Sequence, residues 1–535
     1  MRKGKKFLAF VLAAAMMTIT AACGSSEPST NTPTDSTTGQ EQSTEAADGI
    51  SKGGVMTIVS KADFIYAGCP QASTQSHDWI MSAPAIESLG RRDEKGAIKP
   101  WLAESYDLDE EAMTISIKLR EGITYHDGSP FNAESVVANY NLYQEYANAN
   151  EADLDYAEAT GEYEVLLHLK SLNGSTETML LCDGGRMISV DYYNANKGLD
   201  GTSFMAIGTG PFKMLSADDT SISYKANEDY WIEGQPHLDG IEWILCADES
   251  TAMTILKSGE ADAIYTPTTE DARNLLDQGG FENIGSGSAY YSSGFEISFN
   301  SGDKESPMSN VLVRQAFCTA IDTETIVNAL GFGFYTPTNQ LALPGSNFYS
   351  DNVTGYTYNQ DAAHQLLVEA GYADGCEITL DYISATEKIV VMMQAYLEKA
   401  GFVVNLNLME RAIWTQAMMT SGDTSYNDAI VAYIPFAPAP MAKTFGDAAD
   451  QFSGQWDKEI FAELNGYFNT MQNSLDSAEI SEASDSFQKL LIDEQCMVMP
   501  VYGYYSQVIA SESLHDLGFF ETHTMFWTPE AAWKN

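Results

Sequence analysis

The sequence is short of basic residues. Its 535 residues include 28 Lys and Arg against 75 Asp and Glu, which gives a formal net charge of −47 at pH 7. Nucleic-acid binding depends on Lys and Arg that displace counterions from phosphates, and anionic headgroups attract the same side chains. The composition therefore argues against a nucleic-acid partner and a basic membrane-binding patch. It is typical of a solvated surface that keeps an extracellular protein soluble.

Residue patterns of catalytic and metal sites are also missing. The seven histidines stand singly, and the sequence has no G-x-S-x-G, H-E-x-x-H or C-x-x-C motif and no fixed-period repeat. His126 beside Asp127 is a candidate metal ligand or general base. However, the run 126–130 has the composition of a turn, and no second histidine lies at ligand spacing. We therefore expect no catalytic residues, metal or cofactor, with an exported hydrolase as the alternative.

One apolar run stands at the start of the chain. Four of the first six residues are basic, Phe7–Met17 is apolar, and small residues lead to Cys23. This order predicts a signal peptide over residues 1–22, too short for a permanent membrane helix. The stretch 20–23 resembles a bacterial lipobox, whose cysteine takes a diacylglyceryl group that anchors the protein stably; Thr20 stands where an aliphatic residue is usual. Cleavage after Ala22 without a lipid is the alternative.

Apolar residues are scarce from Cys23 to residue 54. This tract is rich in Ser, Thr, Pro and Glu and predicts a disordered tether behind the lipidated cysteine. No comparable linker recurs, so the folded domains must share the chain through several crossings. Six further cysteines permit disulfides in an exported protein, but most have apolar neighbours, which favours free thiols.

Two stretches predict βαβ units. Each has two strands around a helix, at 240–246, 250–258 and 261–265 in the first unit, and at 378–382, 386–400 and 402–408 in the second. Right-handed crossovers should make the two strands of each unit a parallel pair. Two such units predict two α/β lobes. A cleft between the lobes is the natural ligand site, because ligands bind beyond the carboxyl ends of parallel strands.

Several longer blocks carry a resemblance to a known family. They are PWLAES at 100–105, LREGITYHDGSPFNAESV at 119–136, GTGPF at 208–212, SGEAD at 258–262, VRQAFCTAID at 313–322 and LLVEAGY at 366–372. Over residues 55–510 the chain resembles the family 5 extracellular solute-binding proteins, the class that binds oligopeptides, dipeptides and nickel. The first two blocks together form a long motif, which makes the resemblance specific.

The resemblance implies an architecture. We expect an α/β, periplasmic binding protein-like fold with two α/β lobes, a hinged cleft and an additional domain. The expected boundaries are 55–92, 200–294 and 500–535 for domain I, 93–199 for domain II, the additional domain, and 295–499 for domain III.

The resemblance also implies a function. Such proteins close around a small-molecule or peptide ligand and deliver it to the permease subunits of an ABC importer. We therefore expect a monomer that is lipid-anchored at the outer face of the cytoplasmic membrane or in the periplasm. Service to a signalling receptor in place of a permease is an alternative.

One departure from the family concerns the ligand. Peptide binders of the family hold the free ammonium of the peptide with an aspartate in a W-x-A-D-Y-like stretch. The corresponding stretch here, IVAYIPFAP at 430–438, has no carboxylate. An ammonium buried without a counter-charge is strongly unfavourable, so a free peptide N-terminus is a doubtful ligand unless another acid compensates. A metal chelate, haem or another non-peptide solute is the alternative.

Candidate ligand-binding residues come from three segments. Tyr66 and Cys69 follow the first strand, where family members begin their contact with ligand. Tyr433 and Phe436 lie in the stretch without the aspartate, and Trp414 follows the second βαβ unit. We expect the aromatic rings to offer faces to a ligand, with ordinary packing as the alternative.

Arg186 is a further candidate. It is one of few arginines and lies on a segment that approaches the cleft in relatives. Its guanidinium could clamp a ligand carboxylate through two hydrogen bonds, with a surface ion pair as the alternative.

Overall fold

The computed structural model describes residues 49–535, except for 62–67, 70–75, 94–96, 146–153, 175, 197–204, 286–292, 347, 420–425, 436–451, 453, 506, 524–525 and 528. The predicted signal peptide, Cys23 and nearly all of the tether therefore lie outside the described residues, as do Tyr66 and Phe436. Among the described residues, no helix has the length and apolar character needed to cross a membrane.

The first large sheet has seven strands around β1 (Val55–Ser60). This strand pairs in parallel with β10 (Gly240–Leu245) on one side and with β11 (Ala263–Tyr265) on the other. Antiparallel strands complete the two sides: β9 (Ser221–Ala226) and β8 (Phe212–Ala217) beyond β10, and β19 (Val508–Ser511) and β12 (Phe281–Asn283) beyond β11.

Both faces of this sheet are covered, because successive side chains of a strand point to opposite sides. Ile58 of β1 packs in a core with α1 (Ser76–Ser82), whereas Val59 packs in a core with α5 (Glu249–Ser258) and α6 (Thr269–Gln278). The chain ends α5 at Gly259, whose φ of 79° is in the left-handed region that favours glycine.

The second large sheet has six strands around β13 (Ser293–Phe299). This strand is antiparallel to β17 (Ala429–Pro435) and to β18 (Val498–Tyr504). Beyond β17 lie the parallel strands β15 (Cys376–Tyr382) and β16 (Phe402–Leu408), and beyond β18 lies the antiparallel β14 (Tyr335–Pro337).

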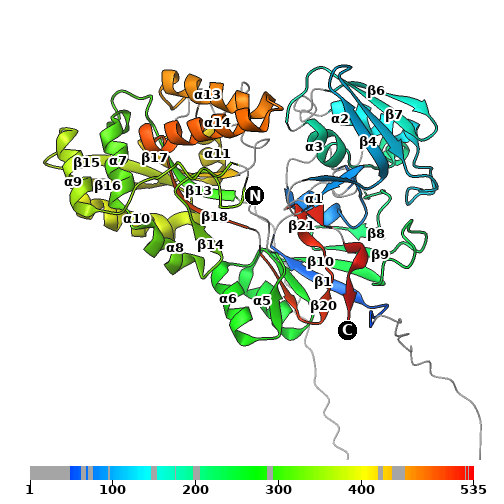
Figure 1. Ribbon diagram of the computed structural model, residues 1–535. Coiled ribbons are helices and arrows are strands. Elements are labelled where there is room, and N and C mark those ends of the chain that lie inside the picture. The colour runs from blue at the N-terminus through cyan, green and yellow to red at the C-terminus, as the bar shows by residue number, and fades with distance from the viewer. Residues whose placement is uncertain are drawn as a thin grey trace, which may run out of the picture. The chain divides into compact units, whose positions relative to one another are not determined.

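Two groups of helices cover the two faces of the second sheet (Figure 1). One face packs against α7 (Val311–Ala320), α8 (Thr323–Gly331), α9 (Gln360–Glu369) and α10 (Glu387–Ala400). The other packs against α11 (Arg411–Met419), α13 (Lys458–Asn473) and α14 (Ser477–Gln488), which continues as the π-helix η8 (Lys489–Glu494). Short 3-10 turns, η6 (Pro307–Ser309) and η7 (Ser384–Thr386), precede α7 and α10.

A smaller antiparallel sheet lies between β1 and β8 in the sequence. Its strands, in order, are β4 (Ala103–Asp109), β5 (Thr114–Leu119), β7 (Glu164–Leu169) and β6 (Leu154–Gly161). The helices of this region are α2 (Ala133–Glu145), α3 (Thr176–Thr178), the π-helix η3 (Met179–Asp183) and α4 (Val190–Asn196). Short pairs are β2 (Gly90–Arg92) with β3 (Ile98–Pro100), β20 (Leu514–His515) with β23 (Trp533–Lys534), and β21 (Phe519–His523) with β22 (Phe526–Trp527); η9 (Pro529–Ala531) precedes β23.

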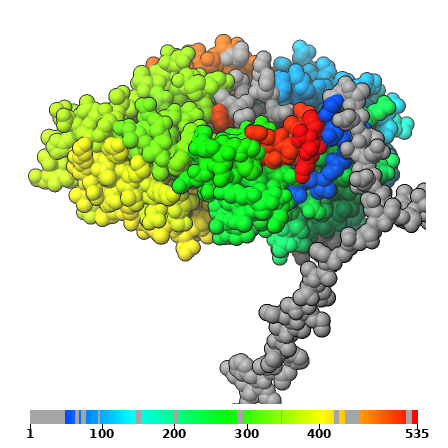
Figure 2. All heavy atoms as spheres, turned by 90° about the horizontal axis from the view of Figure 1, so that it is seen from below, coloured from blue at the N-terminus to red at the C-terminus, as the bar shows by residue number. Residues whose placement is uncertain are grey.

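The chain passes from the first large sheet to the second between β12 and β13, and it returns between β18 and β19. The first lobe, built on the seven-stranded sheet, and the second lobe, built on the six-stranded sheet, also touch directly. Thr269 Oγ1 of α6 donates to Leu330 O of α8 at 3.0 Å, and Arg273 Nε donates to Phe332 O at 3.0 Å. Figure 2 shows the face on which α5 and α6, in bright green, border the second lobe.

The second predicted βαβ unit is confirmed, since β15 and β16 pair directly in parallel on either side of α10. In the first unit, β10 and β11 do run parallel, but our expectation that they pair with each other is wrong. β1, which comes from far upstream in the sequence, lies between them and pairs with both. The helix α5 therefore crosses over one intervening strand.

Candidate ligand-binding site

Arg186 is buried, with 6% of its surface exposed. Its backbone forms an isolated antiparallel β-bridge with the backbone of Ser88. Its guanidinium carbon lies 4.2 Å from the ring centroid of Trp79. Its Nη2 is 3.7 Å from Asp183 Oδ1. Burial lowers the pKa of Arg186, and the Asp183 carboxylate opposes this shift. The alternative of a surface ion pair is therefore wrong, because the pair lies inside the fold.

A small pocket lies beside Arg186. Its cavity volume of about 10 Å³ is room for roughly one water molecule. A solute could enter only if the walls moved apart. The lining residues are Trp79, Ser82, Ala83, Ile86, Glu87, Ser88, Arg91, Arg186 and Trp527.

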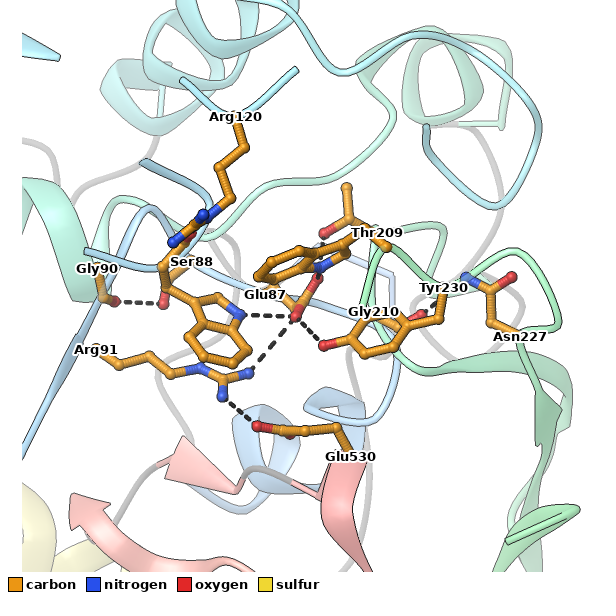
Figure 3. A network of polar contacts seen from close by, with 12 residues as sticks. Glu87, Ser88, Gly90, Arg91, Arg120, Thr209, Gly210, Asn227, Tyr230 and Glu530 are labelled. Atoms are coloured by element: carbon orange, nitrogen blue, oxygen red, sulfur yellow. Dashed lines mark hydrogen bonds and ion pairs between the residues drawn. The ribbon is translucent and has the colours of Figure 1, made fainter. Parts of the chain in front are cut away.

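Glu87, in the wall of this pocket, is a fully buried acceptor for four side chains (Figure 3). Its Oε1 accepts from Trp101 Nε1 at 2.7 Å and from Tyr230 OH at 2.8 Å. Its Oε2 accepts from Thr209 Oγ1 at 2.8 Å and from Trp231 Nε1 at 3.1 Å. Because the four donors come from three separate parts of the chain, this carboxylate ties those parts together.

Arg91 extends the network toward the C-terminus. Its Nη2 lies 3.6 Å from Glu87 Oε1, its Nη1 lies 2.5 Å from Glu530 Oε1, and its Cζ is 3.5 Å from the ring centroid of Trp101. Burial raises the pKa of Glu87, and Arg91 is the strongest of the groups that oppose this. Because both oxygens of Glu87 accept hydrogen bonds from side chains of separate segments, the network makes one wall of the pocket rigid.

Trp414 and Tyr433 lie together in the second lobe. Their ring centroids are 6.3 Å apart, and Trp414 Nε1 donates to Val431 O at 2.8 Å. Tyr433 also meets Phe295 at 5.4 Å and Tyr504 at 6.4 Å. Trp414 is 5% exposed, so the packing alternative describes its position. The cluster lies where β13 begins and β18 ends, next to the two chain crossings.

Cys69 belongs to the core of the first lobe and is 4% exposed. Arg186 contacts Trp79 and Asp183, whereas Trp414 and Tyr433 contact each other in the second lobe. The candidate residues therefore fall into two groups, one in each lobe.

His126 has a structural position. Its Nε2 lies 2.9 Å from Gly210 O, and burial lowers its pKa to about 4. The turn predicted at 126–130 is confirmed: Gly128 has a φ of 85°, and the Ser129 amide donates to Asp127 Oδ1 at 2.9 Å. In the part of the chain that the structure describes, no group of three His, Cys, Asp or Glu could hold a metal ion.

The family model for bacterial extracellular solute-binding proteins, family 5 middle, matches residues 97–451, more than half of the chain. The protein belongs to this family. Its structure has the two-lobe α/β fold of periplasmic binding proteins.

The curated and solved relatives of this family member bind several kinds of solute. The glutathione-binding protein GsiB of Pectobacterium atrosepticum is 30% identical over 329 residues, which are 58% of this chain and 60% of the relative. The ABC transporter-associated periplasmic binding protein DppA of Helicobacter pylori, solved in complex with the peptide STSA, matches with a TM-score of 0.71 at 20% identity, over 90% of this chain and 98% of that one. NikA of Staphylococcus aureus, in complex with Ni(L-His)2, matches with a TM-score of 0.70 at 17% identity, over 90% of this chain and 100% of that one. The chain thus matches less than two thirds of the length of the curated relative.

Sequence reasoning missed Glu296 of this family 5 protein. It stands in β13 directly opposite Ala432, within the stretch 430–438 that lacks a carboxylate. Its side chain is fully buried, and neither carboxylate oxygen has a hydrogen-bond partner of good geometry among the described residues. An acid within the apolar strand sequence GFEISF was the available signal.

Glu296 predicts a pH dependence of stability. Burial raises its pKa well above the ordinary value of 4.5, although the Ile434 amide opposes the shift. The folded state then binds this proton more tightly than the unfolded state, so stability falls as the pH rises from 4.5 through the folded-state pKa. We expect Glu296→Gln to be more stable than the wild type at pH 8 and to lose this advantage toward pH 4.5. For one proton, the difference in unfolding free energy between the variant and the wild type can change by at most about 1.4 kcal/mol per pH unit.

Urea unfolding at several pH values measures this difference. Glu104→Gln is a matched control, because Glu104 is exposed and pairs with Lys118 at the surface. If the unfolding free energies of wild type and Glu296→Gln change with pH in the same way between pH 4.5 and 8, Glu296 does not have a raised pKa in the folded state.

Proposed function

We propose that the protein is the substrate-binding component of an ABC importer, capturing a small peptide or peptide-like solute between its lobes and delivering it to permease subunits in the membrane. The observation that carries this proposal is the two-lobe fold, joined by two chain crossings, in a family 5 chain. Among its relatives are a glutathione-binding protein and a protein solved with a peptide. The protein would act as a monomer without catalysis.

The proposed capture is a closure of the lobes about the two crossings, with domain I at 55–92, 200–294 and 500–535, domain II at 93–199 and domain III at 295–499. The strands β13 and β18, which these bounds divide, belong whole to domain III. Two contacts support the closure. Near the crossings, α6 packs against α8. Away from them, the Gly174 amide donates to Gln472 O at the end of α13 at 2.9 Å. A ligand held by both lobes would favour the closed state, since it binds that state more tightly.

The ligand would carry a cationic group. Glu296 is a buried acid beside the stretch in which the family's aspartate is missing. A ligand ammonium placed next to it would favour the ionised carboxylate over the protonated form, and the ion would then supply the counter-charge that the ammonium requires. The aromatic cluster of Tyr433 and Trp414 would pack on the rest of the solute, and Arg186 would hold a carboxylate. A metal chelate is a second candidate, favoured by the likeness to NikA in complex with Ni(L-His)2.

A thermal-shift screen tests the proposed function. Purified protein is unfolded and refolded to remove carried-over ligand, then mixed with di- and tripeptides with free or acetylated N-termini, with glutathione, and with nickel and histidine. One class should raise the melting temperature, because a ligand at 100 times its Kd stabilises by about 2.7 kcal/mol. Mass spectrometry should recover that solute unchanged. A solute that is hydrolysed would contradict the proposal, as would a flat response to every class.

We also propose that Cys23 is lipidated and that the protein lies at the outer face of the cytoplasmic membrane or in the periplasm. Family membership supports the extracytoplasmic location. Cys23→Ala should release most of the protein from the membrane fraction, because the two acyl chains are lost. Cys246→Ala, which changes a partly buried cysteine of the first lobe, should leave the distribution unchanged. Membrane retention of the Cys23→Ala protein would exclude the anchor.

A further inference from the structure

Two cysteines far apart in the sequence meet inside the second lobe. The Sγ atoms of Cys318, on α7, and Cys496, just before β18, are 3.1 Å apart. The two residues are 178 positions apart and are 3% and 0% exposed. A disulfide needs a sulfur separation of about 2.05 Å, so the two thiols stand roughly 1 Å from bonding distance.

An independent clamp holds the two cysteines face to face. Arg314 lies one turn before Cys318 on α7, and its Nε donates to Cys496 O at 3.0 Å. Its Nη2 donates to Gln495 O at 2.7 Å. These two hydrogen bonds fix the backbone at residues 495 and 496 relative to α7, the helix that carries Cys318.

The backbone at Cys496 is itself unusual. Its φ is +46°, in the left-handed region that residues with a Cβ rarely adopt. The Met497 amide donates to Leu491 O at 2.8 Å and the Gln495 amide donates to Leu490 O at 3.0 Å, which fixes this turn. The conformation directs the Cys496 side chain toward α7, where Cys318 lies.

We propose that Cys318 and Cys496 form a structural disulfide in the mature protein. The family is extracellular, and thiols outside the cytoplasm meet an oxidising environment. In the reaction, the two thiols lose two protons and two electrons to the disulfide of a thiol–disulfide oxidoreductase. One thiolate opens that disulfide to a mixed disulfide, the second displaces the oxidoreductase sulfur, and the oxidoreductase leaves as a dithiol.

The bond would form while the second lobe folds, since both sulfurs are buried afterwards and out of reach of an enzyme. It would join α7 to the segment that leads into β18, and it would close a loop that contains most of the sequence of the second lobe. This proposal does not rest on the identity of the ligand or on transport.

Alkylation followed by mass spectrometry tests the proposal. Protein exported by its own host is denatured in maleimide, with and without prior reduction. The unreduced sample should carry two fewer adducts than the reduced one, and a peptide containing Cys318 should be found joined to one containing Cys496. Full alkylation of both cysteines in the unreduced sample would overturn the proposal, as would a bond from either one to another cysteine.

A stability measurement gives a second readout. Reduction should lower the melting temperature of the wild type by roughly 5–10 °C, because the cross-link restricts the unfolded chain. The double variant Cys318→Ser and Cys496→Ser should show no response to reductant. Cys182→Ser, which changes a buried free cysteine near the four-stranded sheet, should respond as the wild type does. A wild-type melting temperature that ignores reductant would count against a structural bond.

Discussion

Glu87→Ala is expected to lower the free energy of unfolding by about 3–5 kcal/mol, because it leaves four donors inside the fold without their acceptor and removes one of the two carboxylates beside Arg91. The indole nitrogens of Trp101 and Trp231 and the hydroxyls of Tyr230 and Thr209 all converge on this carboxylate. Removal of a single side chain therefore disconnects three parts of the chain. Urea unfolding followed by tryptophan fluorescence measures the loss.

Two comparisons separate this effect from a simple change of charge. Glu104→Ala removes the same charge at an exposed ion pair with Lys118 and should change stability little. Glu87→Gln keeps the shape and one oxygen acceptor but turns an NH2 group toward other donors, so its loss should be intermediate. If Glu87→Ala and Glu104→Ala unfold at the same urea concentration, the network does not hold these segments together.

Arg314→Met is expected to cost about 3–4 kcal/mol, since hydrogen bonds to charged groups contribute roughly 1.5–3 kcal/mol each and buried carbonyls would lose their donors. Arg314 is 2% exposed and donates to Met308 O at 2.6 Å, to Gln495 O at 2.9 and 2.7 Å, and to Cys496 O at 3.0 Å. Burial lowers its pKa, and these carbonyls supply the favourable partners. Differential scanning calorimetry of wild type and variant measures this loss of stability.

The matched control is Arg273→Met. Arg273 also donates to a backbone carbonyl, Phe332 O, but its side chain is 39% exposed, so water can replace the lost bond. Its effect should be small. Arg314→Lys should recover only part of the loss, because an ammonium cannot reproduce the planar fork. Equal melting temperatures for Arg314→Met and Arg273→Met would show that the buried guanidinium is dispensable.

The parts of the fold that sequence predicted are those with a local cause. The alternation in 378–382 and 402–408, separated by a helix that is closed by Gly401, sufficed to predict a parallel pair. The block VRQAFCTAID has structural roles, since Arg314 is buried on α7 and Asp322 is the N-cap of α8. The glycine of the GTGPF block, by contrast, is required by a distant contact, because a Cβ on Gly208 would lie 2.1 Å from Ala85 O.

The rest depended on contacts between distant residues. Nothing near Arg186 in the sequence indicates that Trp79 stacks on it, or that Glu87 collects donors from residues 101, 209, 230 and 231. The insertion of β1 between β10 and β11 is equally non-local. Of the candidate site, sequence named Trp414 and Tyr433 separately, and only the structure brings their rings together. It missed Glu296, which lies on the strand next to that of Tyr433.

The central claim is that a solute holds the two lobes together and leaves unchanged. Small-angle X-ray scattering on the refolded protein, with and without the solute identified by thermal shift, tests it most directly. The account predicts a smaller radius of gyration when that solute is bound, and the original value after dialysis. Identical scattering curves at saturating solute would contradict it.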